Sequence, residues 1–254
     1  ELIKNNITID TILGGKITLK QPKDSYRVGI DAVLLAAMVQ ENIKTTINIL
    51  DLGAGVGSVA LCILYRIANS IVSSIEKVPQ YYELCKENIL LNSFVKDRYT
   101  PYLGDITEFK KLFNSFDIVV SNPPYYKSSD SRKAENTLKA LANTESTAQL
   151  QDFIKVAFNY LKPKGKLYII QKIPRILEIL NNINLNCWGA ITLYPIYSYK
   201  DKSAESAIVV MKKFSKEPFK ITRGIVVHNK DSSYTKEALA IIKDSKGFFE
   251  VIKE

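Results

Sequence analysis

Short apolar runs alternate with longer amphipathic stretches through the middle of the chain. The runs predict strands, and the stretches in which apolar residues recur every three to four positions predict helices. The expected strands cover 46–51, 71–76, 99–103, 116–121 and 166–171, and the expected helices cover 58–68, 80–91 and 150–160. This alternation is typical of a parallel sheet with helical crossovers, so an α/β fold is expected. Two later apolar runs, 190–194 and 206–211, are expected to pair antiparallel at the sheet edge, because no helix-length segment separates them.

Two extensions flank this core. Apolar residues at 7–9 and 16–19 straddle a Leu-Gly-Gly turn, which predicts a hairpin, and Asp31 stands where the N-cap of the following apolar helix is expected. Beyond the core, strand-like residues over 219–227 and a helix near 236–242 form an appendage. The expected organisation is an N-terminal extension over 1–40 that packs on a single core domain over 41–214, followed by a C-terminal appendage over 215–254.

The composition fits a globular protein with a sizeable core, since 46% of the residues are hydrophobic and 24% are charged. No apolar stretch is long enough to span a membrane, and the N-terminal residues lack the apolar core of a secretory signal. The three cysteines lack the paired spacing of a zinc site or a disulfide framework, so no metal is expected and a reducing cytoplasm is the simplest location. A formal net charge of +9 fits a polyanionic partner, but it also fits a merely solvated basic surface.

A glycine-rich turn follows the first expected core strand. Asp51 precedes Gly53, Gly55 and Gly57, and a helix is expected from Ser58. The G-x-G-x-x-G turn that holds a dinucleotide pyrophosphate needs Gly or Ala where this chain has Ser58, so a nicotinamide cofactor is not favoured. S-adenosyl-L-methionine carries no phosphate. Its amino acid moiety can lie against such a loop, and Asp51 offers a carboxylate near its ammonium group.

Acidic residues also follow the next two expected strands. Glu76 ends the second strand, where a carboxylate can accept both ribose hydroxyl groups, and Asp105 follows the third, where it can meet the adenine amino group. Because parallel strands end at one edge of a sheet, these acids and the glycine turn predict a site for S-adenosyl-L-methionine. The competing interpretation is an ordinary glycine turn with unrelated loop acids.

Asn122-Pro123-Pro124-Tyr125 follows the fourth expected strand, at the edge where open α/β sheets bind ligands. A conjugated amino group is a poor nucleophile, because its lone pair is delocalised into the ring. The Asn122 side-chain carbonyl can accept one of its N–H groups and the Pro123 main-chain carbonyl the other, while the two prolines keep the turn rigid. Tyr125 offers a stacking face worth about 1–3 kcal/mol. Methyl transfer by positioning needs neither a metal nor a general base, and a plain proline turn is the competing interpretation.

These motifs resemble those of amino-methyltransferases with a (D/N/S)-P-P-(Y/F) sequence. More narrowly, the chain resembles the bacterial tRNA1(Val) adenine-N6 methyltransferase family in LGGKITLKQPKDSYRVGIDAVLLAA, in SNPPYY and in DSSYTKEALAIIKD. The resemblance implies the Rossmann-like class I methyltransferase fold, with S-adenosyl-L-methionine as cofactor and the adenine next to the anticodon of a tRNA as substrate. It also implies that the segment from Tyr26 to Asp31 lines the cofactor pocket, with Arg27, Gly29 and Asp31 as contacts, and that Asn122 lies against both the cofactor and the acceptor.

Other functions use similar motifs. Enzymes that methylate the glutamine N5 of a release factor share N-P-P-Y, but they carry a helical domain ahead of the catalytic one, whereas the residues before Asp51 look strand-rich here. DNA and ribosomal RNA amino-methyltransferases are further alternatives, and so is a non-catalytic nucleic-acid-binding protein. The segment 127–175 carries ten basic residues against four acidic ones, and its first part, the long polar loop 126–149, is expected to order around the anticodon arm of tRNA. A flexible basic loop without that role is the competing interpretation. The protein is expected to be a monomer.

Overall fold

The computed structural model describes residues 6–23, 27–40, 45–109, 112–124 and 149–252. The strands of the main sheet are β3 (Ile47–Leu52), β4 (Ser70–Glu76), β5 (Tyr99–Leu103), β6 (Phe116–Ser121), β7 (Leu161–Lys172), β8 (Trp188–Tyr199), β9 (Ser206–Lys213), β10 (Lys220–Ile221) and β11 (Ile225–His228). They lie in the order β10-β8-β9-β7-β6-β3-β4-β5, and β11 also pairs with β8. The neighbouring strands β7, β6, β3, β4 and β5 run parallel to one another. Strand β9 lies between β7 and β8 and runs antiparallel to both.

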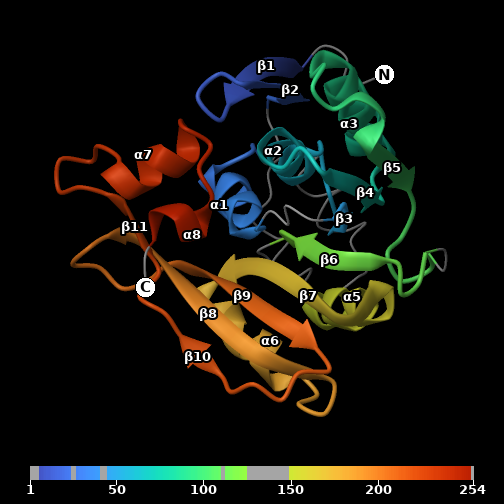
Figure 1. Ribbon diagram of the computed structural model, residues 1–254. Coiled ribbons are helices and arrows are strands. Elements are labelled where there is room, and N and C mark those ends of the chain that lie inside the picture. The colour runs from blue at the N-terminus through green and yellow to red at the C-terminus, as the bar shows by residue number, and fades with distance from the viewer. Residues whose placement is uncertain (1–5, 24–26, 41–44, 110–111, 125–148, 253–254) are drawn as a thin grey trace, which may run out of the picture.

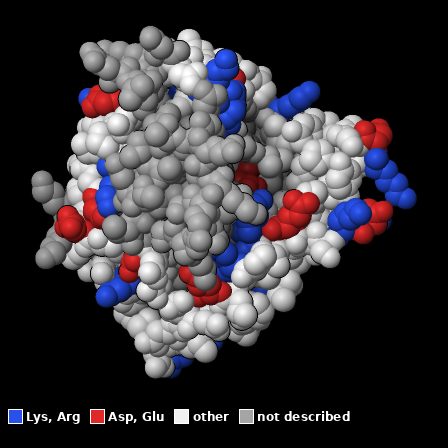
Figure 2. Space-filling model, turned by 180° about the vertical axis from the view of Figure 1, so that it is seen from behind, with Lys and Arg blue, Asp and Glu red and all other residues white. Residues whose placement is uncertain are grey.

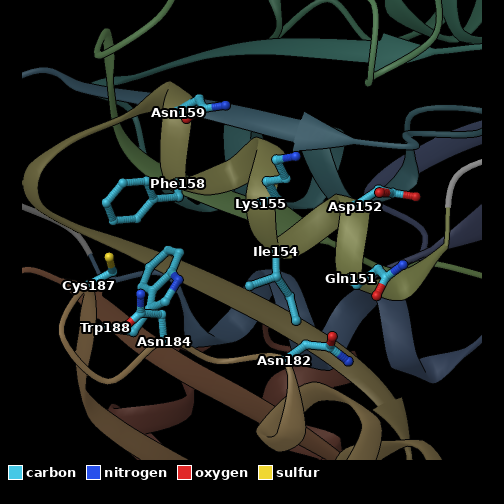
Figure 3. A pocket seen from close by; sticks show the side chains of 10 residues that line it. All are labelled: Gln151, Asp152, Ile154, Lys155, Phe158, Asn159, Asn182, Asn184, Cys187 and Trp188. Atoms are coloured by element: carbon cyan, nitrogen blue, oxygen red, sulfur yellow. The ribbon is translucent and has the colours of Figure 1, made fainter.

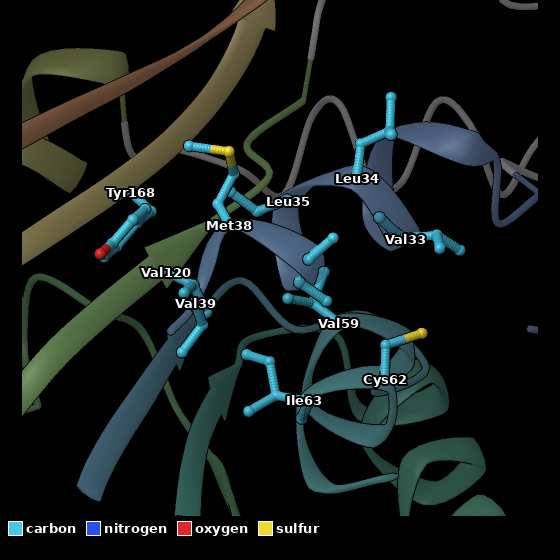
Figure 4. Packing of buried hydrophobic residues seen from close by; sticks show 14 of the residues in the cluster. Val33, Leu34, Leu35, Met38, Val39, Val59, Cys62, Ile63, Val120 and Tyr168 are labelled. Atoms are coloured by element: carbon cyan, nitrogen blue, oxygen red, sulfur yellow. The ribbon is translucent and has the colours of Figure 1, made fainter. Parts of the chain in front are cut away.

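Helices cover both faces of this sheet (Figure 1). The remaining elements are the hairpin strands β1 (Ile7–Ile12) and β2 (Ile17–Pro22), the helices α1 (Ile30–Met38), α2 (Ser58–Arg66), α3 (Pro79–Leu91), α5 (Leu150–Tyr160), α6 (Ile173–Asn181), α7 (Lys236–Ile242) and α8 (Phe248–Val251), and the short 3-10 helix η1 (Lys96–Arg98). Successive side chains of a strand point to opposite faces, so each strand contributes to two cores. Ile49 and Val120 are buried with residues of α1 and α2, whereas Leu50 and Val119 are buried with residues of α5 and α6. Figure 4 shows the first of these cores, in which α1 and α2 pack around Val120 and Tyr168.

The N-terminal hairpin forms a separate two-stranded sheet that is held by α3. Asn88 Oδ1 accepts the Lys20 N–H at 2.6 Å, and Asn92 Oδ1 accepts the Thr18 N–H at 3.1 Å. Each asparagine also donates its amide to the carbonyl of the same β2 residue, so a helix satisfies the open edge of a strand. Asn88 donates in addition to the Val56 carbonyl at 3.0 Å, which ties the hairpin to the turn between β3 and α2.

The C-terminal helices cover the same sheet face as α1. The Phe248 ring is 1% exposed and lies edge-on against the Tyr194 ring, with 5.6 Å between centroids. Arg66, the last residue of α2, donates to the Ser245 carbonyl at 3.1 Å and to the Ala36 carbonyl at 2.6 Å. These bonds join α1, α2 and the segment between α7 and α8. The division of the chain at 40 and 214 stays a prediction.

The expected fold class is confirmed, with several local differences. The antiparallel pair does not form the sheet edge, because β10 and β11 pair with the outer side of β8. α6 was not expected; it begins directly after β7 with Pro174 in its first turn, where proline is well tolerated. β7 begins at Leu161 instead of Lys166, and its pairing with β6 carries a register shift. Asp31 lies in the first turn of α1, whose N-cap is Gly29.

Candidate active site

The glycine turn between β3 and α2 has the backbone conformation that glycine favours. Gly53, Gly55 and Gly57 have φ angles of +72°, +55° and +85°. A Cβ atom on Gly57 would lie 2.8 Å from Cys85 Sγ and 3.0 Å from Tyr99 Oη, so this glycine is required by packing as well as by φ. A Cβ atom on Gly55 would meet no atom within 4 Å, so this part of the turn borders open space.

Glu76, the last residue of β4, fastens the glycine turn. Its Oε2 accepts the Gly55 N–H at 2.7 Å, and its Oε1 accepts the Val78 N–H at 2.8 Å. Burial raises the pKa of the Glu76 carboxyl, and the hydrogen bonds from Val78, Gly55 and Lys77 oppose that rise. The two carboxylate oxygens offer about four lone pairs, and these three N–H groups leave about one of them for a ligand donor.

Asp51 is a buried carboxyl group at the end of β3. It is 1% exposed, and its Oδ2 has no hydrogen-bond partner among the described residues. Burial, and then the charge of Glu76, raise the pKa of Asp51 to about 7, against a lowering by the Ala60 N–H. A buried carboxylate oxygen without a partner is costly, so the position fits a ligand that brings a donor or a positive charge.

Asp105 follows β5 and organises the turn around it. Its Oδ1 accepts the Thr107 N–H at 2.9 Å and the Thr107 hydroxyl at 2.7 Å, while its Oδ2 lies 3.0 Å from Lys77 Nζ. Partial burial raises the pKa of Asp105, but the hydrogen bonds from Thr107 and the Lys77 ammonium outweigh it, so the pKa lies below its usual value.

The turn after β6 presents a second unpartnered oxygen. Asn122 Oδ1 is buried without a hydrogen-bond partner in the described part of the chain. Ser121, just before it, donates its hydroxyl to the Leu52 carbonyl at 2.8 Å, which holds the end of β6 against the end of β3. The Pro123 carbonyl lies 3.3 Å from Gln171 Nε2, while Pro124 is exposed.

The strand register brings most of the predicted site residues to one sheet edge. Leu52 pairs with Ser121, Asp51 with Ser74, and Glu76 with Leu103. Asp51, the glycine turn, Glu76, Asp105 and Asn122 therefore stand at the carboxyl ends of four neighbouring strands, where open parallel sheets bind ligands.

Of the site residues predicted from the N-terminal segment, Asp31 contacts the end of a strand at this edge, whereas Arg27 pairs with the hairpin. Asp31 is 9% exposed and lies 3.8 Å from Lys172 Nζ at the end of β7, which places it near the site. The Arg27 guanidinium instead lies 2.7 Å from Asp10 of β1. Gly29 caps α1, and a Cβ atom on it would meet nothing within 4 Å. Tyr125 and the segment 126–148 lie outside the described residues, as does Tyr26.

Two side chains at the site were not expected from the sequence. Gln171, fully buried near the end of β7, donates to both proline carbonyls of the turn, and Arg175 in α6 donates to the Pro124 carbonyl at 2.8 Å. The only sequence signal was a polar residue at the carboxyl end of the expected strand 166–171.

A cavity of about 460 Å³ lies elsewhere, between α5 and the segment that joins α6 to β8 (Figure 3). Its lining is Gln151, Asp152, Ile154, Lys155, Phe158, Asn159, Asn182, Asn184, Cys187 and Trp188, which includes none of the predicted site residues. Asp152 is already engaged there, because its carboxylate accepts the Gln149 N–H at 2.7 Å.

Figure 2 shows that basic side chains on one face of the molecule are interspersed with acidic ones among the described residues. No helix in the described part of the chain is long and apolar enough to cross a membrane. Within the same residues, no three His, Cys, Asp or Glu side chains are grouped so that they could hold a metal ion.

Residues 27–183 match the methyltransferase small domain family. The tRNA1(Val) (adenine(37)-N6)-methyltransferase of Actinobacillus pleuropneumoniae serotype 5b is 28% identical over 84% of this chain and 87% of its own length. The protein of the same name from Porphyromonas gingivalis W83 is 34% identical over 61% of this chain and 62% of its own length. The solved structure of a predicted O-methyltransferase from Agrobacterium tumefaciens shares the fold, with a TM-score of 0.68 at 21% identity over 83% of this chain and 94% of that one. The expected class I fold and the expected resemblance are confirmed, and the chain belongs to the methyltransferase small domain family.

Proposed function

We propose that this protein transfers a methyl group from S-adenosyl-L-methionine to the N6 amino group of an adenine in tRNA. The observation that carries the proposal is the buried Asn122 Oδ1, which has no partner among the described residues and precedes Pro123 at the edge that also holds the glycine turn. The names of the similar proteins, both tRNA1(Val) (adenine(37)-N6)-methyltransferases, support adenine next to the anticodon as the target. We also propose that the protein acts as a monomer in the cytoplasm.

We assign the cofactor to the residues at the ends of β3, β4 and β5. When bound, S-adenosyl-L-methionine supplies a methyl group on a positively charged sulfur. Asp51 Oδ2, which has no partner among the described residues, fits its ammonium group, and the Glu76 carboxylate at the end of β4 is proposed to accept from the ribose hydroxyls. Asp105 follows β5 at the same edge and is proposed to meet the adenine amino group, while Thr107 and Lys77 hold its carboxylate in place. Gly55 leaves room for close approach of the ligand to the backbone.

The Asn122 turn acts on the acceptor. Asn122 Oδ1 and the Pro123 carbonyl each accept one N–H of the amino group, which draws the nitrogen lone pair out of conjugation and turns it away from both oxygens. The same two acceptors stabilise the positive charge that develops on nitrogen during transfer, and they are fixed before the substrate arrives. Tyr125 is proposed to stack on the base. Arg27, Gly29 and Asp31 are proposed to line the cofactor pocket from the N-terminal side.

Replacing Asn122 with Ala tests the assignment. The variant is expected to lose at least about a hundredfold in kcat, by analogy with the loss of one preorganised donor or acceptor at a transition state. Its affinity for S-adenosyl-L-methionine, measured by calorimetry without RNA, is expected to stay within about threefold of wild type. A variant that keeps its turnover but loses the cofactor would show that Asn122 does not act on the acceptor.

A further inference from the structure

The two prolines of the Asn122 turn can be held only through their carbonyl groups. Proline has no N–H, so Pro123 and Pro124 cannot donate to a neighbouring strand or loop. Any hydrogen bond that fixes the main chain at these positions must therefore come from a donor elsewhere in the protein. The described structure supplies two such donors, the side chains of Gln171 and Arg175.

Gln171 reaches across from β7, the strand next to β6. Its Nε2 lies 3.3 Å from the Pro123 carbonyl oxygen and 3.4 Å from the Pro124 carbonyl oxygen, at the long limit expected when one amide group serves two acceptors. Its Oε1 accepts the Lys172 N–H at 3.0 Å, which fixes the amide with nitrogen towards the prolines. The side chain is 0% exposed, so water does not compete for these bonds.

Arg175 adds a second, charged donor to the outer carbonyl. Its Nη1 lies 2.8 Å from the Pro124 carbonyl oxygen, and its Nη2 pairs with Glu178 at 3.2 Å. Among the described residues, the Pro124 carbonyl thus has both lone pairs in use, whereas the Pro123 carbonyl accepts only from Gln171 and keeps one lone pair. Asn122 Oδ1 has no partner within the same residues, so the turn offers two acceptor positions there, which matches the two N–H groups of an exocyclic amine.

We propose that Gln171 is a positioning residue, which fixes the Pro123 carbonyl and with it the pair of vacant acceptors that receive the amino group. Arg175 anchors the far end of the same turn. This inference rests on the proposed function, because it assigns no new chemistry and concerns the geometry of the acceptor site. Gln171 does not touch the substrate; it determines where the two acceptor oxygens lie.

Gln171→Met tests this role, because methionine keeps the length and bulk of the side chain and removes both donors. A displacement of about 1 Å at a reacting centre costs about a hundredfold in rate, so kcat is expected to fall about 10- to 100-fold. The KM for tRNA and the calorimetric Kd for S-adenosyl-L-methionine are expected to stay within about threefold. Gln171→Glu, which sets a carboxylate against two carbonyl oxygens, is expected to be slower still. The matched control is Gln151→Met, an exposed glutamine of α5 that is expected to behave as wild type.

A kcat for Gln171→Met within twofold of wild type would overturn the proposal, and so would a fall in kcat matched by an equal fall in cofactor affinity. If Gln171→Met does not fold, Arg175→Met provides the test, with an expected three- to tenfold loss of kcat at unchanged cofactor affinity; an unchanged kcat there would also overturn it. Full turnover by Asn122→Ala would instead show that the proposed function has the wrong site. If Asn122→Ala is inactive but Gln171→Met is fully active, the positioning role of Gln171 is refuted and the proposed function is not.

Discussion

Asp51→Asn is expected to make the ligand-free protein more stable at pH 8 and to lower its affinity for the cofactor. Burial, and then the charge of Glu76, raise the pKa of Asp51 from 3.8 to about 7. The pKa of Asp51 is higher in the folded protein than in the unfolded chain. Between about pH 4 and pH 7, the folded protein therefore holds a proton on Asp51 that the unfolded chain has released. The wild-type contribution of Asp51 to stability therefore falls as the pH rises through that window, and it is lowest above pH 7.

The size of the effect follows from the pKa difference. Three pKa units correspond to about 4 kcal/mol, the cost of ionising Asp51 in the folded state at pH 8. Asparagine removes that charge and can keep the bond from Ala60, but its amide group replaces an oxygen that has no partner among the described residues, and a buried amide left unsatisfied costs about 1–3 kcal/mol. The net gain is about 1–3 kcal/mol at pH 8, or a rise of about 2–12 °C in Tm. At pH 5, where wild-type Asp51 is protonated, the gain is expected to vanish or change sign.

Thermal unfolding of both proteins at pH 5 and pH 8 measures this difference, and titrating groups that do not interact with Asp51 cancel in the comparison at each pH. Asp97→Asn, on the exposed helix η1, is the control and is expected to leave Tm unchanged at both values. Calorimetry is expected to show at least a tenfold weaker cofactor affinity for Asp51→Asn at pH 7.5. An Asp51→Asn protein that is no more stable than wild type at pH 8 would refute the reasoning about the buried charge.

Three further variants test contacts that hold the fold and the glycine turn. Lys213→Met is expected to lower the free energy of unfolding by about 2–4 kcal/mol, because the buried ammonium donates to the Phe158 and Leu161 carbonyls, both at 2.7 Å. The cofactor affinity is expected to stay unchanged. A loss below about 0.5 kcal/mol in a denaturant titration would contradict this role. Asn88→Ala is expected to free β2 from α3, seen as faster limited proteolysis of the N-terminal hairpin with the core intact. Gly57→Ala is expected to abolish calorimetric cofactor binding, since its Cβ atom would overlap the residues behind the turn at a φ of +85°.

The core of the fold could be predicted from the sequence because its strands are short apolar runs, most of which end at or beside a polar residue that marks the strand boundary. Asp51, Glu76 and Asn122 each mark where a strand stops, and parallel strands bring such ends to one edge whatever the details of packing. The strands at the outer end of the sheet were less predictable. Only two residues of β10 pair, Lys220 and Ile221, and so short an element has no readable periodicity.

The lateral contacts of the site were beyond the reach of sequence patterns. Gln171 lies near the end of an apolar strand, β7, whose pattern marks it only as a polar residue. It contacts the site only because β7 lies beside β6, and the turn after β6 contains two prolines, which have no N–H group. Arg27 carries a charge that suits a ligand pocket, yet its observed partner is Asp10, a residue of a hairpin whose placement depends on tertiary packing. Such pairings are set by neighbours that are distant in sequence.

The most direct test of the proposed function is transfer of a tritiated methyl group from S-adenosyl-L-methionine to total tRNA, ribosomal RNA and release factor, offered separately, followed by digestion and nucleoside or amino acid analysis. The expected result is label in N6-methyladenosine from tRNA, present with the wild-type protein and absent with Asn122→Ala. Label found only on glutamine of the release factor, or only in ribosomal RNA, would contradict the assignment to tRNA adenine.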